Sequence, residues 1–211
     1  MRLCMFHPVG HPMERGWVGR VDDDRVVHLA AQTLQSFFTG GGTAREHAQY
    51  PLDETVLLAP VLHPPSIRIF DAQGSFAFAN PAAIVGPGGL VSGPTPRLAA
   101  LPRVAVVMGP SGEIGGFTVL AEWRASGVEP PKDRDFALGL GPVVVTPDAA
   151  GPSIDGFDWP SALALAAAGT ALYPGDIVAA PASEPVACDP GDEVVRIEVE
   201  GIGALEQRIA T

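Results

Sequence analysis

The chain has 211 residues, and its 24 Asp and Glu against 13 Lys and Arg give it a net charge of −11. This length suits one domain with a small appendage, and it allows roughly 70% of the unfolded chain's surface to be buried. The negative charge argues against nucleic acid and anionic membranes as partners, because both bind clustered positive charge.

Cysteine content and hydropathy indicate the cellular compartment. Cys4 and Cys188 are the two cysteines of the chain, too few for a disulfide framework. No apolar run approaches the ~20 residues that span a bilayer, and the first residues lack the apolar segment of a signal peptide. A cytoplasmic protein with reduced thiols is predicted.

Residues 1–60 are predicted to form a small α+β module. Residues 3–6 are a short apolar strand, and two further apolar runs, 17–21 and 26–29, flank an Asp-Asp-Asp-Arg turn and predict a hairpin. Residues 33–38 predict a short helix with its apolar side chains on one face.

The histidines do not form a metal-binding pattern. His7 and His11 have the i, i+4 spacing of two ligands on a helix, but a proline follows each and forbids that helix. They are predicted to lie in a surface loop. His28, His47 and His63 have no Cys, His or carboxylate neighbours at ligand spacing and are predicted to be structural or exposed.

Residues 61–211 are predicted to form the main domain. Three nearly continuous apolar runs indicate strands buried on both faces: 104–109, 116–122 and 140–146. The alanine-rich residues 161–172 predict a helix with Ser161 as its N-cap.

The end of the chain carries two Pro-Gly-Asp turns, at 174–176 and 190–192, and each opens an apolar run. Pro presets the turn and Gly relaxes it. Residues 194–200 alternate apolar and charged side chains at period two, which is typical of a half-buried strand. Gly201 and Gly203 then allow a tight bend.

This ending resembles the C-terminal end of the fumarylacetoacetate hydrolase family, where turn, strand and glycine-rich tail recur in the same order. The likeness continues upstream in the segments I-V-G-P-G at 84–88, G-F-T-V at 116–119 and L-G-P-V-V-V-T at 140–146. The resemblance implies a mainly β fold of the α+β class, a mixed β-sandwich roll with a small N-terminal α+β module. It also implies hydrolysis, decarboxylation or isomerisation of small oxo-acids through metal-stabilised enolates.

The family's metal positions are altered in this chain. Members of the family hold Mg²⁺, Mn²⁺ or Ca²⁺ through a Glu-x-Glu and an Asp, because hard dications need several oxygen ligands. Here the Glu-x-Glu falls on Leu101-Pro102-Arg103, and the Asp falls on Glu122, the one carboxylate retained. No metal cofactor is therefore expected, and an Arg103–Glu122 ion pair is predicted in its place.

The family's catalytic positions are also missing. No His-Glu pair follows the strand at 67–70, and general-base chemistry on a water needs such a group within reach. The substrate-holding Gly-Thr-Pro loop falls on Ala179-Ala180-Pro181, which lacks the Gly and the Thr hydroxyl. The Asn-Gly-Glu segment expected before the last helix is absent as well.

Lys132 aligns with a substrate-contacting Lys of the family and is the one candidate catalytic residue. With Arg103, Arg124 or Arg134 it would hold a small anionic oxo-acid. The alternative interpretation of this stretch is a solvated, charged loop.

Three functions remain open. The first is a degenerate family member that acts as a binding or assembly protein, either as a homodimer or paired with a catalytic homologue. The second is a metal-independent hydrolase, decarboxylase or isomerase of a small oxo-acid, in which Lys132, Arg103 or Arg124 stabilises the enolate by charge. The third is a scaffold without a small-molecule site, which a pocket between the strands of Val104 and Val119 would argue against.

Overall fold

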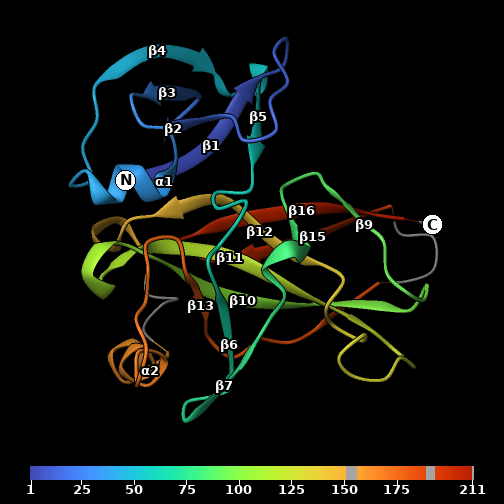
Figure 1. Ribbon diagram of the computed structural model, residues 1–211. Coiled ribbons are helices and arrows are strands. Elements are labelled where there is room, and N and C mark those ends of the chain that lie inside the picture. The colour runs from blue at the N-terminus through green and yellow to red at the C-terminus, as the bar shows by residue number, and fades with distance from the viewer. Residues whose placement is uncertain (151–155, 189–192, 211) are drawn as a thin grey trace.

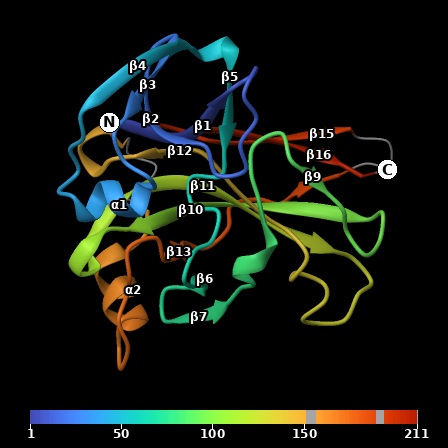
Figure 2. The same cartoon turned by 45° about the horizontal axis from the view of Figure 1, so that its top comes forward.

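The computed structural model describes residues 1–150, 156–188 and 193–210, and it is built mainly of β-strands (Figure 1, Figure 2). The strands are β1 (Arg2–Pro8), β2 (Trp17–Asp22), β3 (Arg25–Leu29), β4 (Glu46–Pro51), β5 (Thr55–Leu58), β6 (Ile67–Ala72), β7 (Ser75–Phe78), β8 (Ile84–Val85), β9 (Leu90–Val91), β10 (Leu98–Met108), β11 (Ile114–Ala125), β12 (Leu138–Val145), β13 (Ile177–Ala179), β14 (Val186–Ala187), β15 (Val194–Val199) and β16 (Gly203–Ile209). The α-helices are α1 (Leu34–Thr39) and α2 (Trp159–Ala166).

Two sheets organise the molecule. The larger runs in the order β4-β3-β2-β1-β12-β11-β10-β13-β6-β7, and the smaller in the order β15-β16-β9. The predicted mainly β fold is confirmed. Antiparallel pairing of β1 with β12 carries the larger sheet from the N-terminal strands into the rest of the chain. The division at residue 60, between β5 and β6, stays a prediction.

The N-terminal elements follow the predicted pattern. β2 and β3 form the hairpin, whose turn holds Asp23 at φ 50°, a conformation that short polar side chains tolerate. α1 begins after Thr33, whose hydroxyl accepts a hydrogen bond from Ser36 N at 3.1 Å, while Thr33 N donates to the Ser36 hydroxyl at 3.0 Å. The surface-loop prediction is wrong for His7, which is 8% exposed and lies in β1, where it pairs with Val56 of β5.

Side chains of β10 and β11 alternate between two apolar cores, as the period of two requires. On one face Ala105 and Leu120 join a cluster that includes the buried residues of α1. On the other face Val119 and Trp123 pack with Ile197 of the smaller sheet. Burying a large apolar side chain contributes about 1.5–3 kcal/mol, so these two layers supply the main stabilisation of the central strands.

Gln207 ties the smaller sheet to the larger one. It is fully buried, and its Oε1 accepts a hydrogen bond from Trp123 Nε1 at 2.8 Å while its Nε2 donates to Val85 O at 3.2 Å. Gly139 leaves the space for it, because a Cβ there would lie 2.2 Å from Gln207 Oε1.

The first Pro-Gly-Asp turn is confirmed, with Gly175 at φ +90°. The Asp176 carboxylate is 1% exposed and accepts hydrogen bonds from the Ser66 hydroxyl at 2.6 Å and from Tyr173 N at 2.7 Å. It also lies 3.9 Å from the guanidinium of Arg68. These contacts fix the start of β13 beside β6, its parallel neighbour.

The alternating strand predicted at 194–200 is β15, with Val195 and Ile197 buried and Arg196 exposed. The second Pro-Gly-Asp turn, 190–192, lies outside the described residues.

The predicted helix at 161–172 is shifted and shorter than expected. Its N-cap is Asp158 and not Ser161: Asp158 Oδ1 accepts the Ser161 N–H at 3.1 Å, and Pro160 sits in the first turn, where its missing N–H is harmless. The helix ends at Ala166, and Gly169 at φ +72° turns the chain soon after.

The structure describes both cysteines, and they form no disulfide with each other. Burial raises the pKa of the Cys4 thiol to about 12, so it stays protonated at neutral pH. In the described parts of the chain, the helices lack the length and apolarity that a membrane crossing requires.

We expect His28 to make the fold less stable in mild acid. The centroid of its ring lies 4.7 Å from that of Trp17, on which it stacks. Its pKa is lowered below the ordinary value mainly by burial and also by the charge of His47. The unfolded chain therefore binds more protons than the folded chain at this position. The neutral His28 ring contributes its full stabilisation above the unfolded-state pKa of about 6.5, and this stabilisation is lost as pH falls through the folded-state pKa. Urea unfolding of the wild type and of His28→Gln across this range tests it.

The exposed His63 supplies the control, since His63→Gln should leave the pH profile unchanged. Identical profiles for the wild type and His28→Gln would show that His28 has no such role.

Candidate functional site

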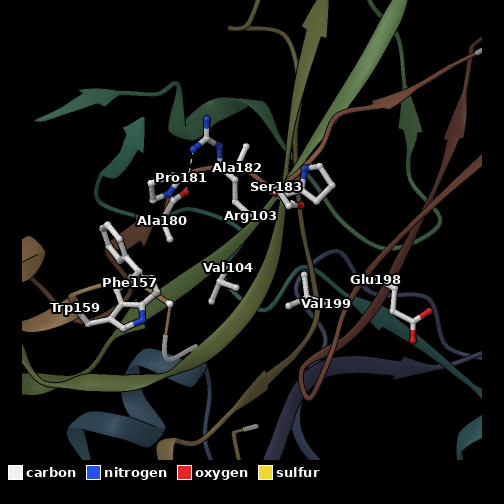
Figure 3. Close-up of a pocket in the computed structure, with 12 residues that line it drawn as sticks. Arg103, Val104, Phe157, Trp159, Ala180, Pro181, Ala182, Ser183, Glu198 and Val199 are labelled. Atoms are coloured by element: carbon white, nitrogen blue, oxygen red, sulfur yellow. Dashed lines mark hydrogen bonds between the residues drawn. The ribbon is translucent and has the colours of Figure 1, made fainter. Parts of the chain in front are cut away.

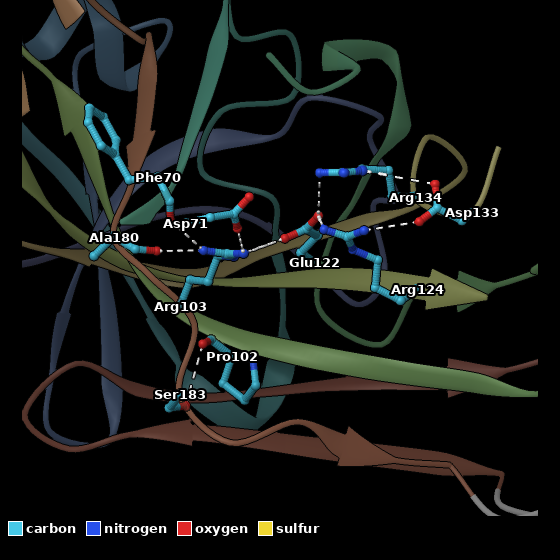
Figure 4. Close-up of polar contacts among 10 residues, drawn as sticks. All are labelled: Phe70, Asp71, Pro102, Arg103, Glu122, Arg124, Asp133, Arg134, Ala180 and Ser183. Carbon is cyan, nitrogen blue, oxygen red and sulfur yellow. Dashed lines mark hydrogen bonds and ion pairs between the residues drawn. The ribbon is translucent and has the colours of Figure 1, made fainter. Parts of the chain in front are cut away.

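The predicted Arg103–Glu122 ion pair forms on one face of the larger sheet, where β10 and β11 pair (Figure 4). Leu101 lies directly opposite Glu122, so Arg103, two residues further along β10, lies diagonally across from it on the same face. Arg103 Nε and Nη2 lie 3.0 Å and 2.7 Å from Glu122 Oε2. Both side chains are 1% exposed.

The other nitrogens of Arg103 are bound as tightly. Nη1 donates to the backbone oxygens of Phe70 and Ala180, at 2.8 Å and 2.9 Å, and Nη2 also donates to Asp71 Oδ1 at 2.9 Å. A guanidinium has five N–H groups, and Arg103 thus has a protein acceptor for each. It has no donor left for a ligand.

Glu122 is held by guanidinium groups at both oxygens. Besides Arg103 at Oε2, Arg124 Nη2 lies 2.7 Å and Arg134 Nη1 3.8 Å from Oε1. A buried carboxylate pays a large desolvation cost, which these cations offset. The Glu122 carboxylate therefore lies between Arg103 on one side and Arg124 and Arg134 on the other.

The outer part of the cluster is also paired. Asp133 Oδ2 accepts from Arg124 Nη1 at 3.0 Å, and Arg134 Nε lies 3.9 Å from Asp133 Oδ1. Lys132, with a side chain 74% exposed, bonds Asp135 at 2.7 Å. Four cations thus face four carboxylates, which leaves the cluster near neutrality: Arg103, Arg124, Arg134 and Lys132 against Asp71, Glu122, Asp133 and Asp135.

Similar solved structures share this whole architecture. Maleylpyruvate hydrolase from Sphingobium sp. SYK-6 has a TM-score of 0.76 at 20% identity, covering 100% of this chain and 99% of that one, and a second structure of it is in complex with manganese(II) ion and pyruvate. 2-Hydroxyhepta-2,4-diene-1,7-dioate isomerase from Mycobacterium marinum has a TM-score of 0.77 at 20% identity, covering 100% and 98%. The chain has the fumarylacetoacetate-hydrolase-type fold.

A third protein with this fold is 2-keto-3-deoxy-D-arabinonate dehydratase, solved in complex with magnesium and 2,5-dioxopentanoate, with a TM-score of 0.78 at 15% identity, covering 99% of this chain and 98% of that one. At these identities the likeness shows the fold alone, which fixes no activity. No family model and no curated protein matches the sequence.

At the positions that the family resemblance assigns to metal ligands, the residues of this chain do not fit a divalent cation. Leu101 carries no oxygen ligand, and Arg103 places a positive charge against the retained Glu122 carboxylate. Within the described ranges, no three His, Cys, Asp or Glu side chains come together as a ligand group.

The structure brings only some of the predicted site residues together. Arg103 and Arg124 meet on Glu122, with Arg134 at longer range, whereas Lys132 turns to Asp135. The sequence predicts no role for Asp71 or Asp133, which complete the cluster. The alternating charges of Lys132-Asp133-Arg134-Asp135 were a signal for Asp133, but no local pattern marks Asp71.

A cleft of about 400 Å³ lies beside β10, and Pro102, Arg103 and Ala180 are among the residues that line it (Figure 3). Val104 lines it together with Phe157, Trp159 and Val199, whereas Val119 does not. It therefore does not lie between the strands of Val104 and Val119, where a pocket would have argued against a scaffold without a small-molecule site. The scaffold alternative stays open.

Proposed function

We propose that this chain is a member of the fumarylacetoacetate hydrolase family that has kept the fold and lost the metal-dependent activity, and that it acts as a binding or assembly protein. The observation that carries the proposal is Arg103, whose five N–H groups are all bound by protein acceptors at the place where the family needs a metal ligand.

The chemistry of the donors supports this proposal. Relatives in fold include enzymes solved with manganese and pyruvate or with magnesium and a dioxo compound. A dication at Glu122 would have to displace Arg103 and Arg124 from a buried carboxylate, which would leave Asp71 and Asp133 as their carboxylate partners. That loss opposes metal binding, since breaking a buried ion pair is strongly destabilising.

We expect calorimetric titration with Mn²⁺ and with Mg²⁺ to give no saturable heat up to about 1 mM, the weak end of the range for protein sites. The reason is that Glu122 is occupied and Leu101 offers no ligand. Glu122→Gln is titrated in parallel as the control. Any heat that comes from unspecific surface binding should be the same in this variant and in the wild type.

Micromolar binding that is lost in Glu122→Gln would overturn the proposal. It would also fail if the metal-free protein turned over a small oxo-acid. One observation favours that alternative, a metal-independent hydrolase, decarboxylase or isomerase: Arg124 Nε is buried without a hydrogen-bond partner among the described residues, and Arg134 makes only ion pairs of 3.8 Å and 3.9 Å. These donors, with Lys132, would be the ones to face an anionic oxo-acid.

The proposal includes assembly as a homodimer, or with a catalytic homologue, in the cytoplasm. In the pairing with a catalytic homologue, the partner would supply the chemistry that this chain lacks.

A further inference from the structure

Most arginines of this chain are paired with carboxylates, but Arg15 is not. Its side chain is exposed between β1 and β2, and among the described residues no hydrogen bond or ion pair involves it. Glu14, its neighbour in the sequence, forms no ion pair with it. A guanidinium carries five N–H donors, and those of Arg15 are available to a ligand.

Arg15 borders a pocket of about 140 Å³ that three other polar side chains also line: Thr33, Gln35 and His63. His63 is exposed, and its ring has no hydrogen-bond partner in the part of the chain that the structure describes. The Thr33 hydroxyl accepts from Ser36 N, which leaves its proton to donate. Among the described residues that line the pocket, none is acidic. The pocket therefore offers several donors and no negative charge.

The first Pro-Gly-Asp turn leaves the space that Gln35 occupies. A Cβ at Gly175 would lie 2.6 Å from Gln35 Cγ and 2.7 Å from its Nε2. Any larger residue at position 175 would push this amide away, and the φ of +90° already favours glycine there. The turn thus determines where one of the pocket's polar side chains lies.

The rest of the pocket wall is apolar. Met5 of β1 lines it together with Pro60 and Leu62 from the segment between β5 and β6. A cavity of about 150 Å³ holds benzene, which has six heavy atoms, so this pocket fits a ligand of similar size. Donors combined with hydrocarbon match a short carboxylic acid, because a guanidinium fork fits a carboxylate and an apolar wall fits its tail.

The pocket is separate from the ion-pair cluster. The segment that contributes Leu62 precedes β6, and Gly175 precedes β13, the parallel partner of β6. The pocket therefore lies near the start of β6, whereas Asp71 of the cluster lies near its end. The four residues of strand from Ile67 to Asp71 span about 13 Å, which is longer than a ligand of six heavy atoms.

We propose that this pocket binds a small monocarboxylate with a short apolar tail. Arg15 pairs with the carboxylate, His63 and Thr33 supply further donors, and the tail lies against Met5 and Leu62. The ligand would join the loop before β2 to the segment before β6. The inference does not depend on the proposed function, because metal titration reports on Glu122 and either result can fail without the other.

Butyrate, butyramide and phosphate test the proposal in a buffer without other carboxylates. Butyramide has the shape of butyrate without its charge, and phosphate has the charge without the tail. The ¹³C-labelled methyl signals of the four methionines are followed by NMR, with Met5 assigned from Met5→Leu. We expect butyrate to shift the Met5 signal saturably with a Kd of about 1–10 mM. Butyramide and phosphate should each bind at least about fivefold more weakly.

Arg15→Gln removes the anchor of the carboxylate and should weaken butyrate binding at least about tenfold. The matched control is Arg97→Gln. Arg97 is an exposed arginine whose side chain likewise has no partner among the described residues, and it does not line the pocket. This variant removes the same charge and should leave binding unchanged.

Both arginines are exposed, so neither substitution should prevent folding. A Met5 signal that never shifts would overturn the proposal. So would butyramide or phosphate binding as tightly as butyrate, or equal losses of butyrate affinity in Arg15→Gln and Arg97→Gln.

Discussion

Replacing Arg103 with methionine is expected to destabilise the fold by about 3–5 kcal/mol, the cost of breaking a buried ion pair from one side. The change leaves the Glu122 carboxylate with Arg124 as its one close cation, and it strips the buried oxygens of Phe70 and Ala180 of a donor. Urea unfolding measures the effect, and an unchanged dependence on urea concentration would show that stability alone has changed.

The matched control is Arg196→Met, which removes two exposed ion pairs, at 2.9 Å and 3.2 Å, and should cost far less stability because exposed pairs are screened by water. The double variant Arg103→Met with Glu122→Leu should recover part of the loss, with a coupling of about 0.5–3 kcal/mol. A loss below about 1 kcal/mol in Arg103→Met would mean that the guanidinium is not needed to keep Glu122 buried.

Much of the fold could be predicted because its signals are local. The apolar runs at 104–109 and 116–122 belong to β10 and β11, and the alternation at 194–200 marks β15, since burial on two faces or on one leaves a direct trace in the sequence. α2 was misplaced because alanines fit a helix but do not say where it ends. Asp158, four residues before the first of these alanines, decided its start.

The site divides in the same way. The Arg103–Glu122 pair was predictable because a resemblance supplied the cross-strand register that single-sequence reasoning lacks. The contact of Asp71 with Arg103 was not predictable, because Asp71 lies in β6. This strand pairs with β13, which stands between it and β10. The cleft was missed for a similar reason: it depends on the six residues 180–185 lying opposite the four residues 101–104 and on Phe157 in a loop, neither of which has a sequence period.

The double variant Leu101→Glu with Arg103→Glu is expected to create a divalent-cation site. Leu101 lies opposite Glu122, and position 103 follows on the same face, so three carboxylates would converge and Asp71 would be released from its present partner. Without metal the like charges should lower stability. With Mn²⁺ at about 100 times its Kd the folded state should gain about 2.7 kcal/mol, read as a rise in Tm.

The variant Leu101→Gln with Arg103→Gln has nearly the same shape and no added charge, and it separates coordination by carboxylates from a general change in packing. It should show no rise in Tm with Mn²⁺, because amide oxygens alone do not supply the charge that a dication needs. A Mn²⁺ effect of equal size in both variants would contradict the idea that Leu101 and Arg103 bar the metal. So would its absence from a folded variant that carries both glutamates, since Arg124 and Arg134 would then be the groups that keep a cation away from Glu122.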